Sequence, residues 1–216
     1  MPALSRRAAT RALAVVAALF VLCTVITAAG LLDGLDRQVA SEVRRTTGHA
    51  ADVALSLVAV TASVPVSLVW MGLLLVATQL TRRRRRRALV LAGGFAAGTI
   101  LEVLLKAALD HPGPRGGSRA VIALGIESIG RGAFPSGHML RGTALALGTA
   151  LILAGERRRT SVRVIAALYV VELAWTRVYL NEHWTSDVIG GFLLGVAAAL
   201  AVVAVPRRRE PARARG

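Results

Sequence analysis

The pair His183 and Asp187 suggests a reactive site, because a histidine and a carboxylate at this interval could act together. They are four residues apart, so on a helix that begins near Trp184 they would share one face. The carboxylate could then bind one ring nitrogen of His183, fix its tautomer and leave the other nitrogen free to attack. We interpret His183 as a candidate nucleophile. A structural His–Asp pair and a zinc site remain alternatives at this point.

The segment Pro135-Ser136-Gly137-His138 stands directly before an apolar stretch. Serine is a favoured N-cap, and glycine lets the backbone approach a ligand closely. The start of a helix is also a natural phosphate-binding place, because it offers free N–H groups. Taken alone, the four residues favour a plain helix start with a histidine at the membrane interface.

Lys106 and Arg177 add two cations beside these segments. Phosphoryl transfer depends mostly on positioning and on electrostatic stabilisation of the phosphoryl oxygens, and a lysine and an arginine supply that charge. Lys106 could equally pair with Glu102 or extend to the interface. Together, two histidines, a carboxylate and two cations are the parts required for phosphoryl transfer through a histidine. The cations also disfavour a metal site.

These candidate residues lie within or beside long apolar blocks of the sequence. The 216 residues are 55% hydrophobic and 18% charged, against about 45–50% and about 25% in ordinary soluble domains. A spanning helix needs about 20 apolar residues. We therefore predict an all-α integral membrane bundle of six transmembrane helices. The expected spans are approximately 12–32, 53–80, 88–109, 138–154, 162–178 and 188–205. Pro65 predicts a kink or late start in the second span.

The net charge of +15 is concentrated in arginine clusters at 82–87, 157–159 and 207–209 and near the N-terminus. Each cluster adjoins an apolar block, which favours membrane topology and contact with anionic lipids over nucleic-acid binding. The positive-inside rule places these clusters in the cytoplasm and residues 33–52, 110–135 and 179–187 outside. Every candidate catalytic residue then falls on the outer side. The agreement is independent support, because the positive-inside rule uses the arginine clusters and none of the candidate catalytic residues.

We expect one membrane domain over residues 1–206 and a disordered basic tail over 207–216. The first apolar block could instead be a cleaved signal peptide ending near Thr27-Ala28-Ala29, although it is longer than usual for one. Cys23 is the one cysteine, so no disulfide can form within the chain. Gly190, Gly191 and Gly195 would let the last helix approach its neighbours closely.

The three segments together resemble the type 2 phosphatidic acid phosphatase family of membrane lipid phosphate phosphatases, which is related to vanadium haloperoxidases. The pattern of that family is a lysine, six residues and Arg-Pro; then Pro-Ser-Gly-His; then Ser-Arg, five residues, His, three residues and Asp. The second part is intact here. In the third, Arg177, His183 and Asp187 match, with Thr176 in place of serine. In the first, Lys106 and Pro114 match, but Gly113 replaces the arginine.

The resemblance implies a role for each matching residue. His183 would be the nucleophile, Asp187 would orient it, and His138 would be the general acid. The phosphate would be bound by four groups: Lys106, Ser136, the Gly137 backbone N–H and Arg177. The resemblance implies no cofactor and no metal. The expected partners are a lipid phosphate and the bilayer, with no nucleic acid.

Gly113 leaves the predicted site short of one guanidinium. Arg115, two residues later in a Gly-Pro loop, is our first candidate for its replacement, and Arg141, one turn beyond His138, is the second. An arginine in an apolar helix is costly without a partner. Arg141 could therefore equally pair with Glu172. Glu102 and Glu172 are interpreted as structural partners of cations, and His49 and His111 as incidental loop residues.

The predicted function is hydrolysis of a lipid phosphate monoester or pyrophosphate at the outer leaflet through a phosphohistidine. Phosphatidic acid, phosphatidylglycerol phosphate and polyprenyl phosphates or pyrophosphates all remain possible substrates. A noncatalytic membrane protein that binds or moves lipid phosphates is the alternative, with Gly113 as the mark of lost catalysis. The retained histidines argue against that alternative, because a binding protein needs no nucleophile.

Overall fold

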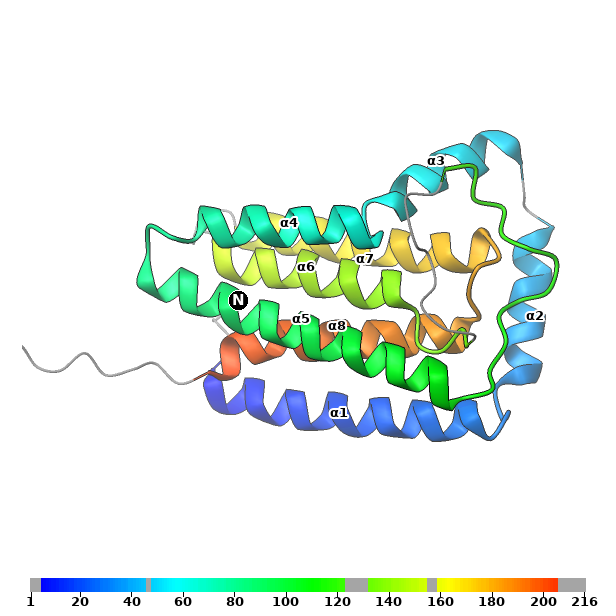
Figure 1. Ribbon diagram of the computed structural model, residues 1–216, viewed down its shortest axis with the longest axis horizontal. Coiled ribbons are helices and arrows are strands. Elements are labelled where there is room, and N and C mark those ends of the chain that lie inside the picture. The colour runs from blue at the N-terminus through cyan, green and yellow to red at the C-terminus, as the bar shows by residue number, and fades with distance from the viewer. Residues whose placement is uncertain (1–4, 46–47, 123–131, 155–158, 206–216) are drawn as a thin grey trace, which may run out of the picture.

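The computed structural model describes residues 5–45, 48–122, 132–154 and 159–205, and within them the chain is helical without strands (Figure 1). The helices are α1 (Arg6–Ala28), α2 (Asp33–Arg44), α3 (His49–Val60), α4 (Val64–Ala77), α5 (Arg82–Ala108), α6 (Gly137–Leu153), α7 (Arg159–Tyr179) and α8 (Thr185–Ala204). The all-α prediction is confirmed for these residues. The basic tail at 207–216 and arginines 157 and 158 lie outside them.

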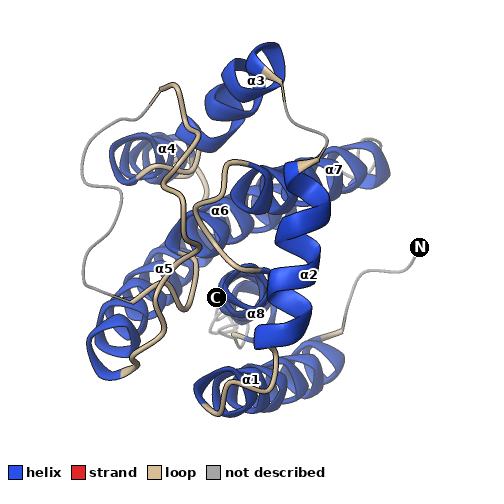
Figure 2. Ribbon diagram, turned by 90° about the vertical axis from the view of Figure 1, so that its right-hand side faces the viewer, coloured by secondary structure: helices blue, strands red, loops and turns tan. Residues whose placement is uncertain are grey.

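The long helices run side by side, and the short helix α2 lies across one end of the bundle (Figures 1 and 2). Most residues of α6 are buried, and α6 packs against α5, α7 and α8. A Cβ added at Gly195 would lie 2.8 Å from the carbonyl oxygen of Leu140, and one at Gly191 would overlap the carbonyl of Ser136. The predicted close approach of the last helix is therefore confirmed, and its partner is α6.

The second apolar block is broken rather than continuous. Helices α3 and α4 meet at an angle of 45° across the break between Val60 and Val64. Pro65 occupies the first turn of α4, where its missing N–H has no intrahelical partner to lose. The prediction of a kink near Pro65 is confirmed.

Three of the described helices, α1, α5 and α8, are long and apolar enough to cross a membrane, and the bent α3–α4 pair would make a fourth. Helix α6 is apolar but has only 17 residues. Large apolar side chains point outward from several helices, such as Val21 on α1, Leu73 on α4 and Leu168 on α7. A soluble protein would bury most such residues, whereas lipid solvates them.

Helix α2 lies in a segment for which the sequence analysis named no element. Its charges are mixed, yet Asp36, Ala40 and Val43 form a buried stripe at helical spacing. The exposed ion pair between Arg37 and Asp33, 3.7 Å apart, contributes little to stability. The helix is held by its buried stripe, and Asp36 within that stripe reaches the site described next.

Candidate active site

The start of α8 brings His183 and Asp187 together. Nδ1 of His183 lies 3.3 Å from Oδ2 of Asp187, and the backbone N–H of Trp184 donates to the same oxygen over 2.9 Å. Both side chains are buried. The spacing of four residues therefore gives the contact expected from the sequence, and Nε2 of His183 is the ring nitrogen left for other chemistry.

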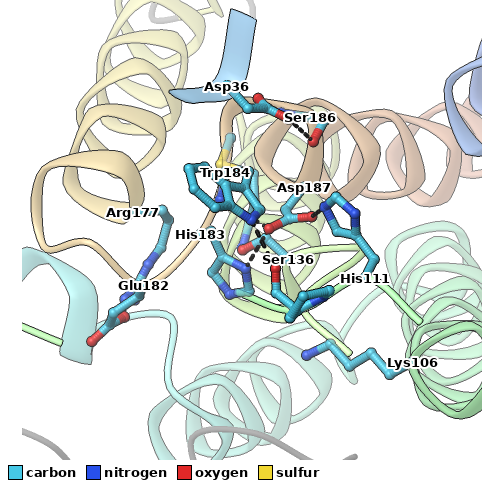
Figure 3. Close-up of polar contacts among 12 residues, drawn as sticks. Asp36, Lys106, His111, Ser136, Arg177, Glu182, His183, Trp184, Ser186 and Asp187 are labelled. Atoms are coloured by element: carbon cyan, nitrogen blue, oxygen red, sulfur yellow. Dashed lines mark hydrogen bonds and ion pairs between the residues drawn. The ribbon is translucent and has the colours of Figure 1, made fainter. Parts of the chain in front are cut away.

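His111 contacts the other oxygen of the same carboxylate. Its Nε2 lies 3.2 Å from Oδ1 of Asp187 (Figure 3). The interpretation of His111 as incidental is therefore wrong. The sequence could not reveal this contact, because His111 follows α5 and Asp187 belongs to α8, 76 residues later. His49, by contrast, is exposed at the start of α3.

Asp36 is a second residue that the sequence analysis missed. Its Oδ1 accepts the backbone N–H of Ser186 over 3.0 Å, and its Oδ2 accepts the Ser186 hydroxyl over 2.6 Å. A carboxylate at the start of a helix satisfies donors that have no partner within the helix. Asp36 thereby fastens α2 to the first turn of α8, beside Asp187.

Ser136 starts α6 and also connects it to α8. Its hydroxyl accepts the N–H of Met139 over 3.4 Å, and its own N–H donates to the carbonyl of Asp187 over 2.9 Å. The predicted N-cap is confirmed. A Cβ at Gly137 would overlap the carboxylate of Glu102, so only glycine fits this close approach of α5 and α6.

Lys106 and Arg141 share one buried carboxylate. Nζ of Lys106 lies 3.0 Å from Oε1 of Glu102, and Nη1 of Arg141 lies 3.2 Å from Oε2. Arg141 also donates from Nε to the carbonyl of Ala62 over 3.2 Å. Glu102 is thus a partner of cations, as predicted. The proposed pairing of Arg141 with Glu172 is wrong, because Glu172 is exposed on α7.

Arg177 lies in the last turn of α7 and is buried. It forms an ion pair with Glu182, whose Oε1 accepts the hydroxyl of Ser118 over 2.7 Å. The carbonyl of Arg177 accepts the N–H groups of Glu182 and His183, both over 3.2 Å. This turn carries the chain from α7 directly to His183, so Arg177 and His183 are placed by the same short loop.

The loop after α5 lies against this turn. Asn181 has a left-handed backbone, with φ at 57°, and its side chain donates to the carbonyls of Arg115 and Gly117 over 3.1 and 2.9 Å. The Arg115 side chain is exposed. A Cβ at Gly113 would make only ordinary contacts at 3.7 Å, with Ala133 and the Glu182 carbonyl. Gly113 therefore borders the site and has space for a side chain.

Figure 3 shows Asp187 between His183 and His111, with Ser136 and Lys106 near them. His138 is buried in the first turn of α6 and lies within electrostatic range of Arg177, His183 and Lys106. The structure therefore brings the histidines, the carboxylate and Lys106 together, while Arg177 acts on the histidines electrostatically and its guanidinium is paired with Glu182. Arg115 is the exception, since only its backbone is placed against the site.

Burial lowers the pKa of His183 below its usual value, and this effect outweighs the opposing effect of Asp187. A neutral imidazole is the form that can act as a nucleophile. In His111 the balance is reversed, and contact with the Asp187 carboxylate raises its pKa. Among the described residues, no three histidine, cysteine or acidic side chains are grouped so that they could hold a metal ion.

Sequence comparison decides the family. The sequence model of the PAP2 superfamily matches residues 87–211, which include every candidate residue from Lys106 to Asp187. The decaprenylphosphoryl-5-phosphoribose phosphatases of two Mycobacterium tuberculosis strains, CDC 1551 / Oshkosh and H37Rv, are each 32% identical to the chain over 147 residues. These cover 66% of this chain and 73% of each relative.

The chain belongs to the PAP2 superfamily.

A solved structure shows that the fold of this PAP2 protein is also shared. It is the first transmembrane PAP2-type phosphatidylglycerolphosphate phosphatase from Bacillus subtilis, with a TM-score of 0.74 and 17% identity. The similarity covers 88% of this chain and 93% of that one. The comparison therefore extends over helices that the family match, which begins at residue 87, does not include. Family and relatives together support a phosphoric ester hydrolase in a membrane.

Proposed function

We propose that this PAP2 protein hydrolyses the phosphate monoester or pyrophosphate group of a lipid at the outer leaflet through a phosphohistidine. One observation carries the proposal: Nδ1 of buried His183 is engaged by Asp187, which leaves Nε2 as the attacking atom. A histidine whose pKa is lowered by burial is neutral at physiological pH and ready to attack.

In the first step, Nε2 of His183 attacks phosphorus and the bond from phosphorus to the lipid oxygen breaks. His138 donates a proton to the departing oxygen. Lys106, Ser136, Arg177 and the N–H of Gly137 bind the phosphoryl oxygens, and the start of α6 adds its dipole. Asp187 stabilises the positive charge that develops on the ring of His183.

In the second step, water attacks the phosphohistidine. His138, now neutral, accepts a proton from that water, and the bond between Nε2 and phosphorus breaks to release inorganic phosphate. Proton and nucleophile are thus returned to their starting positions. The proposed reaction uses side chains and backbone alone and proceeds without a metal ion.

The substrate is proposed to be a lipid because the reacting groups lie at one end of an apolar bundle. We propose that residues 1–206 form a single phosphatase domain with six transmembrane helices, the bent α3–α4 pair counting as one. Helix α5 carries arginines 82–87 at its first end and Lys106 at its last. Its 27 residues measure about 40 Å at about 1.5 Å each, enough to cross a bilayer.

Phosphate release from a panel of lipids tests this function. Purified protein in detergent would be assayed with EDTA present against phosphatidic acid, phosphatidylglycerol phosphate, a polyprenyl pyrophosphate and a polyprenylphosphoryl ribose phosphate. Phosphatidylglycerol phosphate and the polyprenylphosphoryl ribose phosphate are chosen because similar proteins are named as phosphatases of such lipids. Phosphatidic acid and the polyprenyl pyrophosphate are chosen from the family resemblance. Release from at least one lipid, unchanged by EDTA, is expected. No release from any of them would contradict the proposal.

The intermediate is tested by acid-sensitive trapping. After a short reaction with labelled substrate and a denaturing quench, the parent protein should carry an acid-labile phosphoryl group, and His183→Ala should carry none. The matched control is His49→Ala, which changes an exposed histidine far from the site in sequence. Full turnover by His183→Ala would refute the nucleophile assignment.

Orientation is tested by cysteine labelling in intact cells. In a background where Cys23 is replaced, single cysteines at Gln38 on α2 and Arg84 on α5 would each be exposed to a membrane-impermeant thiol reagent. Gln38→Cys should react and Arg84→Cys should be spared, because Asp36 ties α2 to the end of the bundle that holds the site. The reverse pattern would place the site at the inner leaflet.

A noncatalytic lipid-phosphate binding or transport protein is the second candidate. Gly113 favours it, since the family pattern has an arginine there and glycine supplies no charge. The two candidates differ in one result. A binding protein would retain labelled lipid phosphate without releasing inorganic phosphate, and would form no phosphohistidine.

A further inference from the structure

His111 belongs to the short segment between α5 and the Gly113 loop. Its ring is largely buried, with 12% of the side chain exposed. Nε2 approaches Oδ1 of Asp187 to 3.2 Å, while Oδ2 of the same carboxylate is taken by His183 and the N–H of Trp184. The two oxygens of Asp187 are therefore divided between histidines from two distant segments.

The backbone around His111 is fixed on both sides. Its carbonyl accepts the N–H of Ala133 over 2.8 Å, and the next carbonyl, that of Pro112, accepts the indole N–H of Trp184 over 2.8 Å. The ring also meets that of Phe134 edge-on, with centroids 6.4 Å apart. These contacts join the ends of α5 and the starts of α6 and α8, so the ring position is built into the fold.

A carboxylate that is held by one oxygen alone can rotate about its Cβ–Cγ bond, since such torsions have broad minima. A second contact on the opposite oxygen removes this freedom. We propose that His111 is a positioning residue for the phosphoryl-transfer step, holding Oδ1 of Asp187 so that Oδ2 stays aimed at Nδ1 of His183. The inference rests on the function proposed above.

The charge state of His111 decides how much of the carboxylate's charge remains for His183. The carboxylates that act on its ring are Asp187 on α8 and Asp36 and Asp33 on α2, and contact with Asp187 raises the pKa of His111 above its usual value. In its neutral form, His111 still lies against this carboxylate, with Nε2 3.2 Å from Oδ1. Once protonated, it pairs with Asp187 and weakens the support for positive charge on the His183 ring.

The opposite pKa shifts of the two histidines predict how the turnover number changes as pH falls. His111 gains its proton as pH falls through a pKa above its usual value, whereas buried His183 gains one only below its usual value. The turnover number should therefore fall first with the protonation of His111. His111→Gln keeps an amide donor but cannot take up a proton, so its acid limb should move to lower pH.

The test compares His111→Ala, His111→Gln and the control His49→Ala, using the lipid phosphate that the parent hydrolyses fastest. His111→Ala should lower kcat by about 10- to 100-fold, by analogy with the loss when a partner that orients a metal-binding histidine is removed, with KM changed less than about twofold. His111→Gln should recover most of kcat and show the shifted acid limb. Equal kcat and equal pH profiles in all three variants would overturn the proposal.

The pH profile of His111→Gln and the NMR spectrum of the histidine rings test the proposal if His111→Ala does not fold or if no lipid is hydrolysed. If His111→Ala does not fold, an unshifted acid limb in His111→Gln overturns the proposal. If the parent hydrolyses no lipid, the proposed function fails separately, and nitrogen-15 NMR of the histidine rings decides instead. Loss of His111 should reduce the Nδ1–H tautomer of His183 that Asp187 selects, and an unchanged tautomer overturns the positioning role.

Discussion

Two buried carboxylates, Asp187 and Glu102, lie on opposite sides of the site and are used differently. Asp187 on α8 is divided between His183 and His111, two imidazole rings whose pKa values are shifted in opposite directions, lowered in His183 by burial and raised in His111 by contact with Asp187. Glu102 on α5 is divided between a lysine and an arginine, Lys106 and Arg141. One carboxylate therefore contacts two imidazole rings, and the other forms ion pairs with two basic side chains.

The two carboxylates therefore support different proposed tasks: Asp187 supports the nucleophile, and Glu102 supports the cations that would bind phosphate. On the Asp187 side, His111 takes up a proton at a higher pH than His183 does, so His183 stays neutral, as a nucleophile requires. The Glu102 side balances two cations with one anion, so it retains net positive charge where a phosphate is proposed to bind. A buried cation without any partner would be costly, whereas shared neutralisation makes the cluster tolerable.

Replacing Asp187 with asparagine should have the largest effect on turnover. Asparagine keeps the shape but removes the charge and can present its amide to either histidine, so the His183 tautomer is no longer selected. The comparable change in a Ser-His-Asp triad lowers kcat by about 10⁴, and we expect a similar loss here. Steady-state phosphate release from the most active lipid measures it, and a loss below about tenfold would contradict the role of Asp187.

Glu102→Gln should mainly lower stability. It leaves Lys106 and Arg141 buried without their shared anion, and breaking a buried pair costs about 3–5 kcal/mol. The exposed Glu172 on α7 supplies the matched control, Glu172→Gln. Thermal unfolding in detergent, followed by tryptophan fluorescence, should show a marked drop for the first variant alone, equal at pH 6 and pH 8. Equal unfolding temperatures for the two variants would show that the cluster is not stabilising.

Arg115→Ala tests which cation replaces the arginine missing at Gly113. If the exposed Arg115 folds over bound phosphate, its loss should lower kcat/KM by about 10²–10³, the usual cost of one transition-state donor. Gly113→Arg in that background should restore part of the loss, since a Cβ fits at this position. If Arg115→Ala is silent and Arg141→Ala is inactive yet folded, the third cation belongs to α6.

Asp36→Ala should have the smallest effect and should act on stability. It leaves the N–H and hydroxyl of Ser186 without their acceptor, and an unsatisfied buried donor costs about 1–3 kcal/mol. The control is Asp33→Ala, whose side chain is about half exposed and forms an ion pair with Arg37. Hydrogen exchange of the amides in the first turn of α8 should accelerate in the Asp36 variant, and unchanged exchange would show that α2 does not fasten this turn.

Features that depend on local spacing could be predicted before the fold was known. The four-residue interval between His183 and Asp187, the N-cap at Ser136 and the kink at Pro65 follow from helix geometry and backbone sterics, which act over one or two turns. Apolar block lengths likewise indicated a helical membrane protein. The three spaced motifs were sufficient to predict the family.

Which distant residues share a carboxylate could not be predicted, because it depends on how the helices pack. His111 and Asp36 had no recognisable signal, because their contacts with the start of α8 depend on how α2, α5 and α8 pack, and not on neighbours in sequence. The partner of Arg141 was predicted wrongly for the same reason, since Glu102 and Glu172 are both acidic residues in apolar helices. A buried charge is paired with whichever opposite charge the packing brings within reach, and packing is a property of the whole bundle.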